Sequence, residues 1–295
     1  MQIRERLAGR SDLELLKIPH EKRKDQNVRA SLLNEADIAI LCLPDAAARQ
    51  SVSLIKNDNT KVIDASSAFR VDGEWAYGFP EMDKDQAQKI ATATRVSNPG
   101  CYPQGPIIQL APLIREGLLA PGMALSVNAV SGYSGGGRQM IENYQAMGAS
   151  AAKYSPYALD FNHKHLPEMT LYSGLKVEPI FQPAVGNYEQ GMMCMVALQL
   201  GQLSKIPTIR DLHSAIGDHL QKISSSYVEL MELGSRGSLG DLDPQALNGT
   251  NKMQLYVFGN DDRSQAMLVS VYDNLGKGAS GAAVQNLDLM IGATG

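Results

Sequence analysis

The segment DIAILCLP (37–44) is a continuous apolar run that Pro44 ends, and KVIDAS (61–66) is a second such run. Short runs of this kind are typical of strands that are buried on both faces of a sheet. Helical patterns lie before and between them, roughly over Val28–Glu35 and in AAARQSVSLIK (46–56). This alternation predicts an α/β fold with a Rossmann-type parallel sheet covered on both faces.

The chain upstream predicts more of the same sheet. IRERLAG (3–9) is typical of the end of an amphipathic helix stopped by Gly9, and LELLKI (13–18) predicts a short strand. A dinucleotide-binding sheet opens with a strand and a glycine-rich turn before its first helix. No G-x-G-x-x-G precedes LELLKI. We therefore expect the first strand and turn, roughly 15–20 residues, to be missing from this sequence.

A basic turn follows LELLKI. In such folds the end of the second strand meets the adenosine ribose, where basic groups favour a 2′-phosphate. A solvated surface turn explains the same residues equally well. The basic residues are His20, Lys22, Arg23 and Lys24, and they favour NADPH over NADH.

The second half of the chain changes character. Strand patterns outnumber helical ones there, which predicts an α+β domain with a mixed or antiparallel sheet. The predicted strands are in MALSVNAVSGYSGGGRQM (123–140), MMCMVALQL (192–200) and MLVSVYDNL (267–275), and the predicted helices are IRDLHSAIGDHLQKI (209–223) and KGASGAAVQNLDLMIG (277–292).

Composition limits the function. The 295 residues are 44% hydrophobic and 20% charged, which is enough apolar content for a core and about two domains. A net charge of −4 argues against nucleic acid as a partner. Three scattered cysteines, Cys42, Cys101 and Cys194, indicate neither a disulfide framework nor a structural zinc site and fit a reducing, cytoplasmic compartment. No apolar run is long enough for a membrane span.

Cys101 stands out among the cysteines. It lies in SNPGCYPQGP (97–106), before the helix-like run IIQLAPLI. The positive end of a helix and its unpaired N–H groups favour the nucleophilic thiolate and can stabilise an oxyanion. A buried, inert thiol is the alternative, and it is the interpretation that we give to Cys42 and Cys194, which lie in apolar strands.

HKHLPE (163–168) offers a base for that thiol. His165 stands three residues before Glu168, close enough for the carboxylate to fix the tautomer of the ring. A metal site and plain surface histidines are alternatives, although no further ligand cluster is evident in the sequence.

Two polar segments are candidates for binding anions. SGYSGGGR (131–138) is a glycine-rich turn after a strand, which suits an anion nest or a flexible loop. DASSAFR (64–70) follows a parallel strand at its carboxyl end, where ligands bind in open α/β sheets. Arg70 could bind a phosphate there with its planar guanidinium, or it could be a surface residue.

Taken together, these motifs resemble a known family. DASSAFR, YGFPE (77–81), NPGCYP (98–103), SGYSGGG, HKHLPE and KGASGAAVQN occur in order between about Asp37 and Asn286. They resemble the N-acetyl-γ-glutamyl-phosphate reductases of arginine biosynthesis, most closely their shorter form. The last motif is shared with aspartate-semialdehyde dehydrogenases and supports the superfamily more than the substrate.

The resemblance implies an NADP-dependent oxidoreductase of a small anionic acyl phosphate, acting through a cysteine thioester. Cys101 would be the nucleophile and His165 the acid/base, with Glu168 supporting it. The implied substrate contacts are Arg70, Asn98, His163 and Arg138, with Lys164 a further candidate for the substrate carboxylate. The implied cofactor contacts are Ser66, Ser134, Gly135, Gly136 and Asn286, with NADPH as the cofactor and no metal.

The resemblance also implies a domain plan and an assembly. An NADP-binding domain is expected over 1–99 and 276–295, and a catalytic and oligomerisation domain over 100–275. A homo-oligomer, dimer or tetramer, is expected. One further departure is Gln104, where the family has a small hydroxyl residue that would cap the helix beside Cys101.

Other functions stay open on the sequence alone. A dehydrogenase of aspartate semialdehyde or a similar substrate uses the same chemistry, and HKHLPE argues against it. A cofactor-free cysteine hydrolase would leave the parallel sheet and the last helix unexplained. A non-catalytic relic is suggested by the missing first strand.

Overall fold

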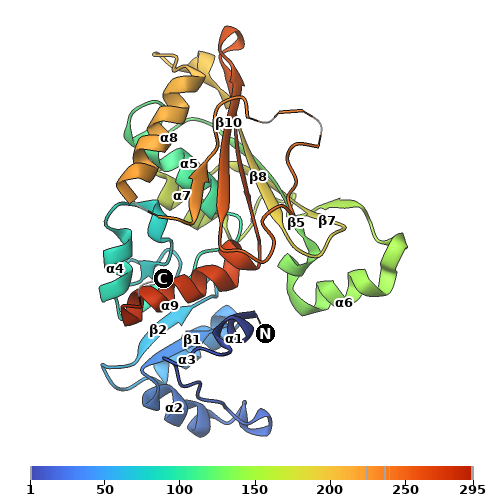
Figure 1. Cartoon of the computed structure of the whole chain (residues 1–295). Coiled ribbons are helices and arrows are strands. Elements are labelled where there is room, and N and C mark those ends of the chain that lie inside the picture. The colour runs from blue at the N-terminus through green and yellow to red at the C-terminus, as the bar shows by residue number, and fades with distance from the viewer. Residues whose placement is uncertain (1, 224, 236, 239, 294–295) are drawn as a thin grey trace. The chain divides into compact units, whose positions relative to one another are not determined.

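The computed structural model describes residues 2–223, 225–235, 237–238 and 240–293, which fall into two compact units (Figure 1). Unit 1 consists of the described parts of Met1–Pro80, Gln86–Pro99 and Ser280–Gly295. Unit 2 consists of Glu81–Asp85 and the described parts of Gly100–Ala279. The chain crosses between the units at residues 80–81, 85–86, 99–100 and 279–280, so each unit joins segments that are distant in sequence.

Unit 1 is built on a parallel sheet, as the alternating pattern predicts. Its strand order is β1-β2-β4-β3, and every pair of neighbours is parallel. The strands are β1 (Ile38–Leu41), β2 (Lys61–Asp64), β3 (Ala76–Tyr77) and β4 (Arg95–Ser97), and the helices are α1 (Gln2–Leu7), α2 (Gln26–Glu35), α3 (Asp45–Ser53), α4 (Gln86–Thr92) and α9 (Gly281–Ile291).

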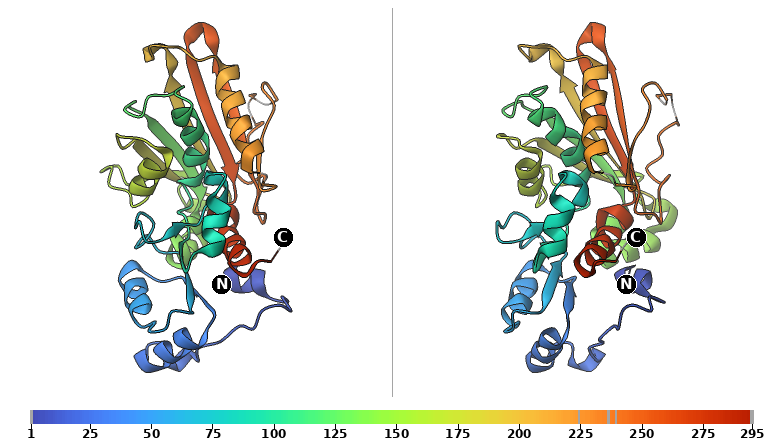
Figure 2. Two further views of the ribbon diagram at one scale, coloured as in Figure 1. Left: turned by 90° about the vertical axis from the view of Figure 1, so that its left-hand side faces the viewer. Right: turned by 60° about the vertical axis from the view of Figure 1, so that its left-hand side comes forward.

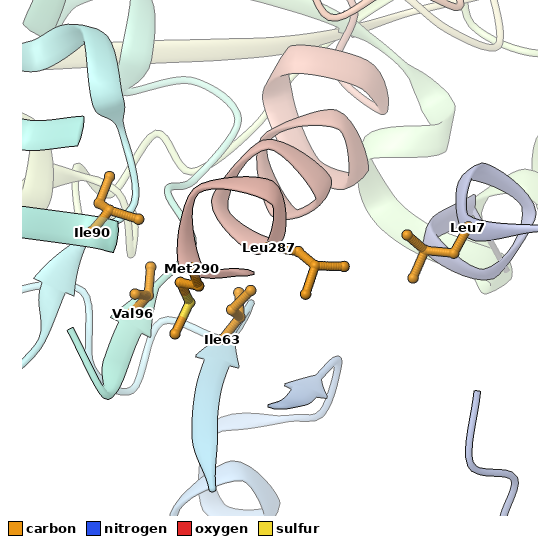
Figure 3. Close-up of a cluster of buried hydrophobic side chains, with 6 residues drawn as sticks. All are labelled: Leu7, Ile63, Ile90, Val96, Leu287 and Met290. Carbon is orange, nitrogen blue, oxygen red and sulfur yellow. The ribbon is translucent and has the colours of Figure 1, made fainter. Parts of the chain in front are cut away.

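Both faces of this sheet are covered because neighbouring residues of a strand point to opposite sides. Ile63 of β2 belongs to the cluster in Figure 3, which joins β2 and β4 to α1, α4 and α9. Val62, its neighbour, packs on the other side with Leu41, Ala48 and Trp75. The strand is therefore apolar throughout, as expected for a parallel sheet between two layers.

The predicted strand LELLKI is wrong. Residues 13–19 form no regular element, and Leu15, Leu16 and Ile18 are 40%, 42% and 37% exposed. A strand exists only where a neighbour completes its hydrogen bonds. Among the described strands none pairs with 13–18, and β1 at the edge of its sheet pairs with β2 alone. Apolar composition without such a neighbour leaves this segment irregular.

Unit 2 contains a mixed sheet, which confirms the α+β prediction. Its order is β6-β7-β5-β8-β11-β10-β9, with parallel pairs β5–β7 and β9–β10 and antiparallel pairs elsewhere. The strands are β5 (Ser126–Gly132), β6 (Tyr154–Pro156), β7 (Ile180–Gly186), β8 (Met192–Gln199), β9 (Val228–Leu230), β10 (Met253–Asn260) and β11 (Gln265–Tyr272).

Helices cover one face of this sheet. Both α5 (Gln104–Arg115) and α8 (Ile209–Ile223) lie along it, and α7 (Leu166–Ser173) packs on α5 (Figures 1 and 2). Ser270 and Tyr272 of β11 point toward α5, whereas Val269 and Val271 belong to an apolar cluster on the opposite face. Among the described residues, no helix combines the length and the apolar character needed to cross a membrane.

The glycine-rich segment is more regular than a loop. After β5, Tyr133–Gly136 form a 3₁₀ turn, and α6 (Gly137–Met147) starts inside the glycine run. Gly137 has φ +74°, a left-handed conformation that glycine adopts readily. At the end of β11, Gly276–Ser280 form a π-helix that leads into α9.

Candidate active site

Cys101 lies in a turn that leads into α5. Residues 101–103 form this turn, and Pro103 is the N-cap of the helix, with no side-chain cap. Cys101 takes part in no disulfide, and the residue is half-buried. By contrast, Cys194 is fully buried, and burial raises the pKa of its thiol to about 12. Cys42 lies just after β1 and is exposed, not buried in the strand as expected.

The backbone of this turn is held from the sheet. The hydroxyl of Tyr272 donates to the carbonyl oxygen of Cys101 over 2.7 Å and lies 3.2 Å from that of Tyr102. Burial raises the pKa of Tyr272 well above its ordinary value, so the hydroxyl keeps its proton for this contact. The strand β11 therefore fixes the height of Cys101 above the sheet.

Glu168 holds the same turn from α7. Its Oε2 accepts a hydrogen bond from the main-chain N–H of Gly100 over 3.0 Å, and the residue is 1% exposed. Glu168 occupies the first turn of α7, where a carboxylate also interacts favourably with the helix dipole. The contact expected from the sequence was with the His165 ring. The structure adds one with the residue before Cys101.

His165 is the N-cap residue of α7 and is 5% exposed. Its main-chain N–H donates to Nδ1 of His163 over 3.1 Å, and the two ring centroids are 4.6 Å apart. The centroid of the Tyr102 ring lies 5.9 Å from that of His165. The HKHLPE motif thus places an imidazole beside the residue that follows Cys101.

Tyr102 links three of the motifs. Its hydroxyl donates to Oγ of Ser131, at the start of the glycine-rich segment, over 2.9 Å. The Tyr157 hydroxyl donates to this Tyr102 hydroxyl over 3.4 Å, and the Tyr157 ring is tilted against that of His163, with centroids 5.7 Å apart. Burial raises the pKa of Tyr157 to about 12. Sequence reasoning missed Tyr157, although it stands in the loop just before HKHLPE.

The glycine-rich segment is shaped by its own packing. Oγ of Ser134 accepts a hydrogen bond from Asn274 over 3.0 Å, and Ser134 is buried. A Cβ at Gly135 would lie 3.1 Å from Oγ of Ser131, and one at Gly136 would lie 2.4 Å from Sδ of Met140. A side chain at Gly135 would need a small shift of the Ser131 hydroxyl, and one at Gly136 would displace the Met140 side chain, so local packing favours glycine at both positions.

Arg138 and Lys164 are the least supported of the expected substrate contacts. The Arg138 side chain is 92% exposed, and its Nε pairs with Glu142 one turn along α6 at 2.6 Å. Lys164 is also exposed. An exposed ion pair of this kind contributes little to stability and shows no orientation toward a ligand.

Unit 1 holds the remaining candidates at the carboxyl end of its sheet. Arg70 is 7% exposed and donates from Nε to the carbonyl oxygen of Asn98 and from Nη2 to that of Ala65, both over 3.1 Å. Ser66 donates from Oγ to Oδ2 of Asp64 over 2.5 Å. Burial raises the pKa of this Asp64 carboxyl.

Asn286 supplies a buried acceptor. Its Nδ2 donates to the carbonyl oxygen of Gly78 over 2.9 Å and to Oδ1 of Asn98 over 3.1 Å. Its Oδ1 is buried and has no hydrogen-bond partner among the described residues. Buried polar atoms are rarely left without a partner. This oxygen suits an N–H donor such as the carboxamide of a nicotinamide, so the residues present fit that group.

Two further sequence-based interpretations concern the basic turn and a possible metal site. His20–Lys22 form an exposed 3₁₀ turn in which Arg23 Nη1 lies 2.6 Å from Nε2 of His20. Within the described residues, no group of three or more His, Cys, Asp or Glu side chains could hold a metal ion.

Comparisons with known proteins show the family to which the chain belongs. Residues 5–90 match the family model of the semialdehyde dehydrogenase NAD binding domain, and residues 101–274 match that of the semialdehyde dehydrogenase dimerisation domain. An N-acetyl-gamma-glutamyl-phosphate reductase of Mesorhizobium japonicum is 58% identical over 99% of this chain and 95% of its own length. An N-acetyl-gamma-glutamyl-phosphate reductase 2 of Pseudomonas putida is 49% identical, over 99% and 93%.

A solved structure shows the same fold. Aspartate semialdehyde dehydrogenase II from Vibrio cholerae superposes with a TM-score of 0.68, covering 88% of this chain and 81% of its own. Its sequence is 16% identical, so the likeness concerns the fold alone.

Proposed function

Because the chain belongs to the N-acetyl-γ-glutamyl-phosphate reductases of the semialdehyde dehydrogenase family, we propose that it reduces N-acetyl-γ-glutamyl phosphate to N-acetylglutamate semialdehyde and releases phosphate. The observation that carries the proposal is the half-buried Cys101, held by Tyr272 and next to the Glu168 contact at Gly100. A thiol fixed in this way is suited to covalent catalysis.

The first half-reaction forms a thioester. Sγ of Cys101 attacks the γ-acyl carbon, the bond from that carbon to the phosphate oxygen breaks, and phosphate leaves with the bonding electrons. His165 takes the thiol proton. The start of α5 offers main-chain N–H groups close to the developing oxyanion.

The second half-reaction releases the aldehyde. NADPH, when bound, supplies the hydride that reduces the thioester. His165 manages the proton on the oxygen of the resulting hemithioacetal, and collapse of that adduct breaks the C–S bond and restores the Cys101 thiol. One acyl phosphate, one hydride and one proton thus give one aldehyde and one phosphate.

Substrate binding is assigned to the buried Arg70 and Asn98 and to the half-buried His163. Arg70 is a buried cation suited to the phosphate, and Asn98 and His163 are the further contacts. Arg138 gains no support from its exposed ion pair. For the cofactor, Asn286 would accept from the nicotinamide carboxamide, and Ser66, Ser134, Gly135 and Gly136 are the other contacts. The basic turn at His20–Lys22 favours NADPH.

We also propose that the chain forms a homo-oligomer, a dimer or a tetramer. The support is the match of residues 101–274 to a dimerisation domain. Size-exclusion chromatography with light scattering should give two or four times the 31.9 kDa of one chain, and a mass of 31.9 kDa would contradict the proposal.

The proposal is tested by following NADP⁺ reduction with N-acetylglutamate semialdehyde and phosphate. The parent chain should be active, Cys101→Ala should be inactive, and the exposed Cys42→Ala should keep the parent rate. Turnover that survives in Cys101→Ala would remove the thioester route. Faster turnover with aspartate semialdehyde than with N-acetylglutamate semialdehyde would overturn the substrate assignment.

A further inference from the structure

Unit 2 contains a buried ion pair that the reaction above does not use. Nζ of Lys277 lies 2.8 Å from Oε2 of Glu81, and both side chains have 0% exposure. Oε1 of Glu81 accepts a hydrogen bond from Ser225 over 3.0 Å, and the ammonium lies 5.5 Å from the centre of the Tyr227 ring. A buried ion pair is seldom worth more to stability than apolar residues of the same volume. Its directional contacts therefore point to another role.

The main chain of Lys277 belongs to the π-helix Gly276–Ser280, a rare element that is frequent at functional sites. This π-helix touches Cys101. A Cβ built on Gly278 would lie 3.0 Å from Cβ of Cys101, so the two backbones are as close as side chains allow. Contacts that hold the π-helix in place therefore also fix a surface against which Cys101 packs.

Gln104 links the π-helix to the turn that contains Cys101. It is the first residue of α5 and has 0% exposure. Its Nε2 donates to the carbonyl oxygen of Lys277 over 2.8 Å and lies 3.4 Å from that of Gly100. One amide group thus contacts both the π-helix and the residue before Cys101. This is the position at which the sequence departs from the expected small hydroxyl residue.

We propose that Glu81, Lys277 and Gln104 are positioning residues, which hold the π-helix against Cys101 and so fix its sulfur for attack on the acyl carbon. The ion pair with Glu81 fixes the Lys277 side chain. The Gln104 amide, which binds the Lys277 carbonyl, then fixes the Cys101 turn relative to the π-helix. Misplacement of a reacting atom by about 1 Å can cost 10²-fold in rate. This inference rests on the proposed function for its catalytic consequence, and on Cys101 reactivity for a consequence that needs no substrate.

A matched pair of variants tests the role of Gln104. Gln109 lies on the same helix, has the same 0% exposure, and donates from Nε2 to the carbonyl oxygens of Val269 and Tyr256 in the sheet, at 3.0 and 3.4 Å. Gln104→Met and Gln109→Met remove the same group from equally buried sites. Melting temperature, kcat, KM and the rate of Cys101 alkylation by iodoacetamide are measured, with the alkylated peptide identified by mass spectrometry to separate it from Cys42.

The melting temperatures of the two variants should fall by similar amounts. Gln104→Met should slow Cys101 alkylation and kcat about tenfold with KM within about twofold, because the misplacement acts on the sulfur. Gln109→Met should leave both rates within about twofold. Equal rates in Gln104→Met and the parent would overturn the proposal, and so would equal slowing in the two variants.

A second pair tests the ion pair and keeps the inference testable if Gln104→Met does not fold. Lys277→Met leaves the Glu81 carboxylate buried without its partner, which should lower the melting temperature sharply. Glu81→Gln combined with Lys277→Met removes the buried charge, so stability should recover while alkylation of Cys101 stays slow. Recovery of both together would show that the pair acts only through stability and would overturn the proposal.

The two proposals fail in different ways. Slow alkylation in Gln104→Met, together with a parent chain inactive on N-acetylglutamate semialdehyde, would uphold the positioning role and remove the proposed function. Normal alkylation in Gln104→Met, together with an active parent chain, would remove the positioning role and uphold the proposed function.

Discussion

The carboxylate of Glu168 accepts a hydrogen bond from the main-chain N–H of Gly100, 3.0 Å away, and this N–H belongs to the residue immediately before Cys101. Both groups are buried. A hydrogen bond to a charged group contributes about 1.5–3 kcal/mol. The turn that presents the nucleophile is therefore held by an acid from a helix that starts 65 residues later, at Leu166.

Two replacements of Glu168 should separate the effect of its negative charge from the effect of its hydrogen bond to Gly100. Glu168→Gln keeps an acceptor for Gly100, so we expect folding to be retained and kcat to fall about tenfold. Glu168→Leu leaves the buried N–H without its acceptor, which should cost about 1–3 kcal/mol of unfolding free energy and lower kcat further. Urea unfolding and NADP⁺ reduction measure the two effects. The exposed Glu142→Gln is the control and should change neither.

Tyr272→Phe should loosen the Cys101 turn from the other side. The variant loses the hydroxyl that lies 2.7 Å from the Cys101 carbonyl oxygen, at a cost of about 1 kcal/mol and about 2–4 °C in Tm. We expect kcat to fall with it. Tyr256→Phe, whose hydroxyl contacts Gln254 on the same sheet at 2.9 Å, is the matched variant. A kcat for Tyr272→Phe no lower than that for Tyr256→Phe would contradict the anchoring role.

Gly278→Ala should disturb Cys101 directly. The added methyl would lie 3.0 Å from Cβ of Cys101 and 3.2 Å from the carbonyl oxygen of Asp273, so the turn or the cysteine must shift. We expect slower alkylation of Cys101 and a lower kcat. At Gly122 the same change meets nothing within 4 Å, and Gly122→Ala should behave like the parent chain.

Acid stability should depend on His219. Burial lowers the pKa of this imidazole below its ordinary value of 6.5, with Arg115 and Lys222 adding to the effect and a hydrogen bond to the Glu81 carbonyl opposing it. Since the unfolded chain takes up the proton first, stability falls as the pH drops from 6.5 through the lowered pKa. His219→Gln should flatten this part of a plot of Tm against pH.

Local pattern was enough to predict much of the fold. The helix predicted over 209–223 coincides with α8, and the strands of 37–44, 61–66, 192–200 and 267–275 are present in shortened or shifted form. The resemblance drawn from the motifs is confirmed by relatives at 58% and 49% identity. The predicted strand at LELLKI is wrong because a strand depends on a neighbour. The strands β3, β4, β6 and β9 were missed because each has only two or three residues, and β7 because Pro183 interrupts its pattern. The eight-residue β10 was missed although its pattern is neither short nor interrupted.

The contacts within the site were beyond reach of the sequence. Tyr272 lies 171 residues from Cys101, and Lys277 lies 196 residues from Glu81, so neither pairing leaves a local pattern. Gln104 was noted only as a departure from a family motif. Its hydrogen bond to the Lys277 carbonyl, 173 residues away in sequence, appears only in the structure. The assignments of Cys101, His165, Asn286 and the other candidate residues to catalysis and binding remain predictions for the experiments above.

The interleaving of the two units sets the order in which this protein can mature on the ribosome. The core of unit 1 needs Leu287 and Met290 from α9, and unit 2 needs Glu81, which is made early, to neutralise Lys277, which is made late. Domains that are continuous in sequence can fold one after another during synthesis. Here neither unit is complete until Lys277, Leu287 and Met290 have been made, so the Cys101 turn reaches its final surroundings only after those residues have emerged.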